Sequence, residues 1–161
     1  MLWIPLAFAT PPTPTATSTP TPDPAKLYAT ECGACHFAFP ARFLPIRSWT
    51  ALIGDLSHHF GEDASLDAAS RGLILTWLMG DAADLHRSRI PADQTPLRIT
   101  ELPWFRGEHA EIPSRYVKDN PAVKSLARCD ACHTRAGEGH FGEGDLRIPG
   151  VGRWEEEGDD D

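Results

Sequence analysis

Two short segments of this chain place a pair of cysteines three positions apart with a histidine directly after the second. They are residues 32–36 (Cys-Gly-Ala-Cys-His) and 129–133 (Cys-Asp-Ala-Cys-His), and they contain every cysteine of the sequence: Cys32, Cys35, Cys129 and Cys132. Two thiols at this spacing can form thioethers to the two vinyl groups of one haem, which holds the next residue beneath the iron. The pattern therefore predicts two covalently bound haem c groups, with His36 and His133 as proximal iron ligands.

Two other uses of these cysteines have to be weighed. Four cysteines and two histidines could hold zinc, and a C-x-x-C pair could be a redox dithiol or a disulfide. A zinc site would require the two segments, 97 positions apart (129 − 32), to meet in space. Neither use explains why a histidine follows each second cysteine. The pattern favours haem attachment, which takes place outside the cytoplasm.

An iron with a proximal histidine either takes a sixth ligand or keeps an open position, and this difference decides its function. In the first half, Trp49, Leu52, Ile53 and Leu56 form an apolar stripe at helical spacing that continues to His59. His59 is thus the best candidate for the sixth ligand there, although a histidine on an apolar stripe is ordinarily a packing residue. His58 falls on the polar side and is expected in solvent.

His109 is the second candidate. It follows the aromatic stretch 102–105 and precedes the second motif by 20 positions (129 − 109). The alternative interpretation is that His109 is an exposed loop histidine among charged neighbours. Met79 is expected to pack inside the protein rather than bind iron. His86 and His140, with charged or glycine-rich neighbours, are expected on the surface.

Helices are expected to position these groups in the first half. Asp23 and Pro24 predict the start of a helix over residues 25–31 that leads into the first motif. The proline-punctuated, aromatic stretch 37–45 predicts a loop along one haem edge. Two longer helices follow: one over 49–60, opened by Ser48 and ended by Gly61, and one over 66–85, capped by Ser65.

The second half lacks this regularity. Four prolines between residues 87 and 113 predict a long helix-poor connection. Residues 114–119 could form one or two turns, and a short helix over 122–130 is expected to lead into the second motif. The glycine-rich remainder to Trp154 is expected to be irregular. The chain is thus predicted to be mainly α, with two haem modules of unequal design.

Composition divides the chain further. Residues 10–24 are almost entirely Pro, Thr, Ala and Ser, which predicts an extended linker. The expected organisation is a signal peptide lacking its first residues (1–9), a Pro/Thr-rich linker (10–24), a first haem domain (25–87), a second haem domain (88–154) and an acidic tail (155–161). The apolar start and Ala7-Phe8-Ala9 fit a secretory signal, although Pro5 interrupts the run and no basic residue precedes it.

The net charge of −8 comes mostly from the tail, whose seven residues include six acids. Without it, 17 acidic residues face 15 basic ones (23 − 6 against 15), so the body is nearly neutral and nucleic-acid binding is not expected. The tail is expected to be a solvated, disordered end. The alternative interpretation is that its negative charge steers the protein towards a basic redox partner.

The motifs resemble those of the dihaem cytochrome c family, DHC. The resemblance runs in order from Tyr28 to Pro149 through Tyr28-x-x-Glu31 before the first motif, Phe39-Pro40, Leu44-Pro45, Ser48-Trp49, His59-Phe60-Gly61-Glu62-Asp63-Ala64, Arg98-Ile99-Thr100, Leu102-Pro103-Trp104-Phe105, His109, Ile112-Pro113, the second motif, Gly139, Phe141 and Ile148-Pro149. It implies a small cytochrome c-like helical domain, a less regular second haem domain, and two bis-histidine haems with His59 and His109 as distal ligands. We pair His59 with the haem of His36, and His109 with that of His133.

The resemblance also implies a periplasmic protein that exchanges electrons with an oxygen-binding haem protein or a membrane b-type cytochrome. Two irons that each have six ligands predict an electron carrier rather than an enzyme. This carrier is expected to contact the membrane only through a partner, and to lie near the inner membrane if the linker is a tether. The alternatives are a peroxidase-like enzyme or small-ligand sensor with one open haem, and a structural subunit docked to a membrane cytochrome.

Overall fold

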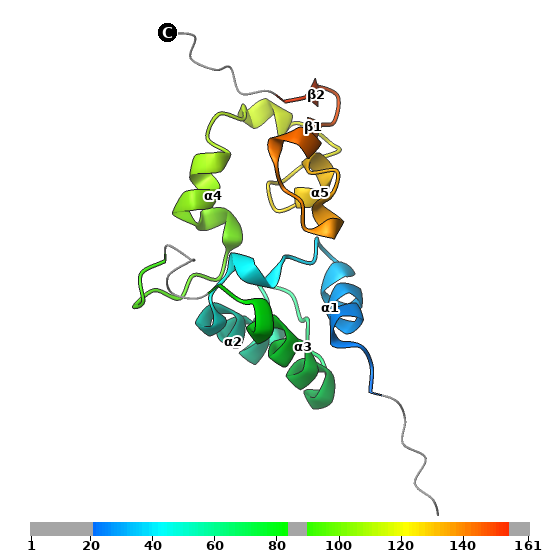
Figure 1. The fold of residues 1–161 in the computed structure, drawn as a ribbon, viewed down its shortest axis with the longest axis vertical. Helices are drawn as coiled ribbons and strands as arrows, with labels where there is room; N and C mark the ends of the chain where they lie inside the picture. Colours follow the sequence, from blue (N-terminus) through cyan, green and yellow to red (C-terminus); the bar gives the residue numbers. More distant parts are fainter. Residues whose placement is uncertain (1–20, 84–89, 155–161) are drawn as a thin grey trace, which may run out of the picture.

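The computed structural model describes residues 21–83 and 90–154. The expected signal peptide, residues 10–20 of the linker, His86 and the acidic tail lie outside this part of the chain. The described residues form a mainly helical fold, as predicted. Figure 1 shows α1, α2 and α3 at one end of the molecule and α4, α5 and the strands β1 and β2 at the other.

Helix α1 (Pro24–Gly33) confirms the predicted helix before the first motif. The Asp23 carboxylate accepts hydrogen bonds from the backbone N–H groups of Ala25 and Lys26, and Pro24 occupies the first turn, where its missing N–H costs nothing. The helix ends inside the first motif, so its last turn carries Cys32.

Helix α2 (Ile46–Gly54) is shorter than predicted at one end and starts earlier at the other. Ser48 is not its cap: it is fully buried inside the helix, and the carbonyl of Pro45 accepts the first helical bonds. The helix stops at Gly54 instead of continuing to Phe60. Gly54 is a poor helix former, and Asp55 after it leaves the helical conformation (φ −133°, ψ 53°).

Helix α3 (Ala68–Asp81) packs against α1 and α2. Its cap is Asp67, which accepts hydrogen bonds from the backbone N–H groups of Ala69 and Ser70; the predicted cap at Ser65 is wrong. The helix ends at Asp81, four residues before the predicted end, because Ala82 adopts an extended conformation (φ −63°, ψ 149°).

The second half contains a helix in the stretch expected to be helix-poor, and less helix than predicted directly before its motif. Helix α4 (Pro103–Glu108) lies in the stretch expected to be helix-poor, with Pro103 in its first turn. A 3₁₀ turn at Ser114–Tyr116 confirms the predicted turn. The helix predicted over 122–130 is wrong: Lys124 has a left-handed backbone (φ 65°), and only α5 (Cys129–Cys132) is helical there.

The chain ends in a short antiparallel pair, β1 (Arg147–Ile148) and β2 (Gly152–Arg153). One cluster of buried side chains includes Leu44, Trp49 and Ile74 from the first half and Ile99 and Phe105 from the second. The division into haem domains at 25–87 and 88–154 stays a prediction, and this shared cluster joins the two parts. None of the helices formed by the described residues is long and apolar enough to cross a membrane.

Candidate haem sites

Site 1 consists of Cys32, Cys35, His36 and His59. Cys32 is half-buried on the last turn of α1, and His36 follows the end of that helix. The imidazole rings of His36 and His59 are nearly parallel, with their centres 6.0 Å apart and their planes 20° from parallel. The structure thus brings together the two histidines that the sequence assigned to the first haem.

A tight turn, not a helix, presents His59. The backbone N–H of His59 donates to the carbonyl of Glu62 (2.9 Å), and the N–H of Glu62 donates back (3.1 Å). Phe60 and Gly61 between them have left-handed backbones, with φ of 56° and 103°. Glycine at position 61 is explained because a side chain would strain that conformation. The histidine is therefore held by a closed loop of two reciprocal hydrogen bonds.

Site 2 consists of Cys129, Cys132, His133 and His109. The N–H of His133 donates to the carbonyl of Cys129 (2.8 Å), which continues the turn of α5. His109 is the residue that ends α4. The ring centres of His109 and His133 lie 6.2 Å apart, with planes at 74°. Again the structure pairs the two histidines that the sequence assigned to one haem.

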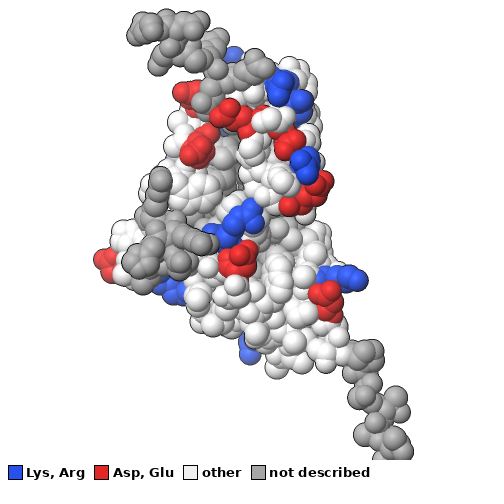
Figure 2. All heavy atoms as spheres, in the orientation of Figure 1, with Lys and Arg blue, Asp and Glu red and all other residues white. Residues whose placement is uncertain are grey.

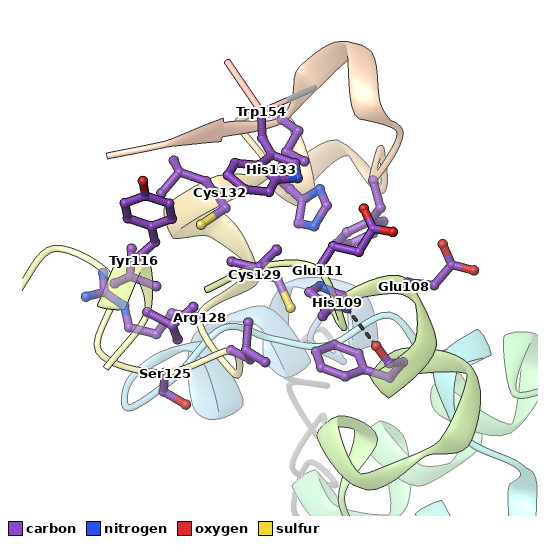
Figure 3. A pocket seen from close by; sticks show the side chains of 18 of the residues that line it. Glu108, His109, Glu111, Tyr116, Ser125, Arg128, Cys129, Cys132, His133 and Trp154 are labelled. Carbon is purple, nitrogen blue, oxygen red and sulfur yellow. Dashed lines mark hydrogen bonds between the residues drawn. The ribbon is translucent and has the colours of Figure 1, made fainter. Parts of the chain in front are cut away.

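A cavity of about 330 Å³ lies at site 2, within the roughly 300–1,000 Å³ typical of small-molecule and cofactor sites. Figure 3 shows the side chains of Cys129, Cys132, His133 and His109 around it. Its apolar wall comes from all parts of the chain: Phe43, Trp104, Phe105, Val123, Phe141, Leu146 and Ile148. The stretch 37–45 was expected along one haem edge, and its Phe43 lines this cavity; sequence reasoning missed Phe141 as a wall residue.

Both histidine pairs have the separation that one iron requires. If two imidazoles bind a metal from opposite sides with nitrogens about 2 Å away, their ring centres are about 6 Å apart. Nδ1 of His36 lies 2.7 Å from the carbonyl of Phe37, and Nδ1 of His109 lies 2.8 Å from that of Phe105. Because a carbonyl only accepts, these Nδ1 atoms carry the proton, which leaves the lone pair on Nε2 for a metal.

Burial controls the charge of the site residues. It raises the pKa of the Cys32 thiol to about 11, with Glu31 acting in the same direction, and raises the pKa of Cys129 to about 11. Burial also lowers the pKa of His59, helped by His36 and Arg98, and that of His133, helped by His109. At neutral pH these imidazoles are uncharged, which is the form that binds a metal.

The two motifs lie in separate sites, so the zinc centre that would join them is not formed. In the part of the chain that the structure describes, no three His, Cys, Asp or Glu side chains gather to hold a metal ion. Nδ1 of His59 and Nδ1 of His133 are buried with no hydrogen-bond partner among the described residues. The donor sets fit two separate haems.

The other candidates among the described residues are exposed. His58 is exposed and its Nδ1 lies 2.7 Å from the Asp55 carboxylate, which raises its pKa. His140 is exposed, as predicted. Met79 is 44% exposed on α3, so the expectation that it packs inside the protein is wrong, because α3 turns this face to solvent.

Comparison with known proteins decides the family. The family model described as dihaem cytochrome c matches residues 28–141. This chain belongs to the dihaem cytochrome c family. As in the rest of the family, it carries two covalently bound haem c groups and is an electron-transfer haem protein.

Solved structures agree. A dihaem cytochrome type c from Shewanella baltica OS155 is 41% identical (TM-score 0.72), with 83% of this chain and 99% of that chain covered. A dihaem cytochrome c from Rhodobacter sphaeroides is 51% identical (TM-score 0.67), with 72% and 95% covered. A crystal structure of DHC purified from Rhodobacter sphaeroides is 52% identical (TM-score 0.61), with 72% and 96% covered. A search of the curated proteins finds no match.

Proposed function

We propose that this dihaem cytochrome is an electron carrier, not an enzyme, in which both irons are closed by two histidines. His36 and His59 bind the iron of site 1, and His133 and His109 bind that of site 2. The observation that supports this most directly is the separation of the two ring pairs, 6.0 and 6.2 Å. An iron with six ligands leaves no position for a substrate.

The chain's own residues keep the ligands in place. The carbonyls of Phe37 and Phe105 fix the proton of His36 and His109 on Nδ1, and the ring of Phe105 stacks on that of His109 with centres 4.0 Å apart. Haem iron supplies one-electron chemistry when bound. A protein frame that does not move between oxidation states favours fast exchange of a single electron.

We further propose that the protein works in the periplasm and exchanges electrons with an oxygen-binding haem protein or with a b-type cytochrome of the inner membrane. The family resemblance supports these partners. On the face in Figure 2, acidic and basic side chains are interspersed over the second half of the molecule, whereas few lie over the first half. Mixed charge of this kind suits a transient protein partner and not a nucleic acid.

Histidine variants test the ligand assignment. His59→Ala and His109→Ala should each turn one haem high-spin and make it bind carbon monoxide, with the other haem unchanged. His58→Ala is the matched control, because His58 is adjacent in sequence but exposed and bound to Asp55. Optical and electron paramagnetic resonance (EPR) spectra report both haems. Rapid binding of carbon monoxide by the reduced wild-type protein would overturn the closed-site model in favour of an enzyme or sensor.

Partner exchange is tested separately. The oxidised or reduced protein is mixed with each candidate partner in a stopped-flow instrument, and the haem bands of both proteins are followed. Electron exchange faster than that with an unrelated haem protein of the same net charge supports the assignment. Equal rates with the unrelated protein contradict it.

A further inference from the structure

Three phenylalanine rings meet where the two halves of the protein touch. Phe37 and Phe43 belong to the first half, and Phe141 belongs to the second. The ring centre of Phe141 lies 6.3 Å from that of Phe37 and 5.0 Å from that of Phe43, both in edge-on geometry. All three side chains are half-buried. Edge-to-face pairs at these distances are stable, directly packed contacts.

This aromatic contact reaches a proximal ligand on each side. Phe37 directly follows His36, and its carbonyl lies 2.7 Å from Nδ1 of that histidine. On the other side, the ring of Phe141 lies 5.4 Å from the ring of His133. The path from His36 to His133 therefore crosses between the halves at a single ring-to-ring contact, Phe37 to Phe141.

A second path is longer. It leaves Phe141 through Phe43 and passes Trp104 (5.6 Å) and Phe105 (5.8 Å) before it reaches His109 (4.0 Å). It has three further ring-to-ring gaps beyond Phe43, whereas Phe141 contacts His133 directly. Both paths include Phe141, so this residue is common to every ring-to-ring connection between the two sites among the described residues.

Arg42 fixes the contact. Its Nη2 donates to the carbonyl of Gly139 (2.8 Å), 97 positions away, and its Cζ lies 5.5 Å from the ring centre of Phe43 and 5.9 Å from that of Phe141. Gly139 has a left-handed backbone (φ 82°), and a Cβ there would lie 3.5 Å from the guanidinium. The guanidinium thus joins the segment that carries Phe141 to the segment that carries Phe43.

We propose that Phe141 is the residue through which an electron passes between the two haem sites. The inference rests on the proposed electron-carrier function and adds the internal route. In the step, one iron goes from Fe(II) to Fe(III) as the other goes from Fe(III) to Fe(II); no proton or atom is transferred. Phe141 contributes the packed ring between the sites and is not itself oxidised or reduced.

The test compares Phe141→Leu with Phe141→Tyr in the holoprotein. Exchange nuclear magnetic resonance of the half-reduced protein measures how fast the electron moves between the haems, from the haem methyl signals. Leucine removes the ring and opens a gap, which removes atom-to-atom contact across it, so the exchange rate should fall below that of the wild type. Tyrosine keeps the ring, and its hydroxyl can reach water at this half-buried position, so the rate should stay at the wild-type value.

Phe60→Leu is the matched control. Its ring also touches an axial histidine, with centres 4.8 Å apart from His59, but no ring contact connects it with site 2 among the described residues. This variant should keep the wild-type exchange rate. EPR spectra and reduction potentials of all variants should match the wild type, which shows that the ligands are intact.

An unchanged rate in Phe141→Leu, with unchanged EPR spectra, would overturn the route. If Phe141→Leu does not take up both haems, Phe37→Leu tests the same contact from the other side, with the same expected fall. Failure of the route and failure of the carrier function are distinguishable: an unchanged rate rejects only the route, whereas carbon monoxide binding to the wild type rejects the closed sites.

Discussion

Arg98 places a positive charge next to site 1, and Arg98→Gln should lower the reduction potential of that haem. The guanidinium carbon of Arg98 lies 4.0 Å from the ring centre of Phe60, which lies 4.8 Å from that of His59. Adding about 3 Å from an imidazole centre to a bound metal gives at most about 12 Å between charge and iron. A positive charge favours the reduced iron, so its removal favours the oxidised one.

The size of the shift follows from Coulomb's law. At about 12 Å, one charge contributes about 1.4 kcal/mol at an effective dielectric constant of about 20, and about 0.35 kcal/mol in water. For one electron these energies correspond to about 60 and about 15 mV. Arg98 is 49% exposed and pairs with Glu101 (3.6 Å), so we expect a fall of at least about 15 mV, the value for water at the largest separation. Loss of the arginine also leaves the Glu101 carboxylate unpaired, which acts in the same direction.

An EPR-monitored redox titration of both haems at low ionic strength is the assay, because salt screens charges over about 10 Å at 0.1 M. Arg115→Gln is the reciprocal control: its guanidinium carbon lies 4.5 Å from the ring centre of Tyr116, which lines the cavity of site 2. It should lower only the site 2 potential. Equal shifts of both haems in Arg98→Gln, or no shift at site 1, would refute the reasoning.

The remaining predictions concern spectra and stability. Oxidised wild type should give two distinct low-spin EPR signals, since the ligand planes cross at 20° in site 1 and 74° in site 2; a single signal accounting for both irons would contradict this. Trp49→Phe should lose about 1 kcal/mol in urea unfolding, because it removes the buried 2.7 Å donor of the Ala41 carbonyl, which keeps only the longer bond from the Leu44 N–H (3.3 Å); an unchanged free energy of unfolding would contradict this. Hydrogen bonding to Ser70 lowers the pKa of Asp67, so its charge stabilises the fold above the unfolded value of about 3.9, and this contribution is lost as the pH falls through the folded value. Asp67→Asn should therefore be less stable than wild type at pH 6 and should converge with it in acid; a difference independent of pH would contradict the assignment.

The sequence predicted which histidines lie together better than it predicted the elements that carry them. His59 was expected on an apolar helical stripe, but α2 ends at Gly54 and a turn presents the imidazole. Hydrophobic periodicity continued past the true end because Leu56 is buried too. Gly54 marks the true end of the helix and Asp55 after it is not helical, which an argument from hydrophobic periodicity does not take into account.

Site 2 shows the opposite error. Prolines predicted a helix-poor connection, yet Pro103 starts α4, because proline is favoured in the first helical turn. That signal was present in the sequence and could have placed His109 at a helix end. The contact of Phe37 and Phe43 with Phe141 could not have been found, since it joins residues about a hundred positions apart and leaves no local pattern.

The position of Phe43 in the wall of site 2 has a consequence for how the protein is made. Phe43 precedes Cys129 by 86 positions (129 − 43), so synthesis from the N-terminus delivers this wall residue long before the second motif. The first half can then serve as a folded surface against which the second half packs. A fragment that begins at residue 88 would have to mature without one side of its own pocket, and the two halves are better understood as an ordered assembly than as interchangeable units.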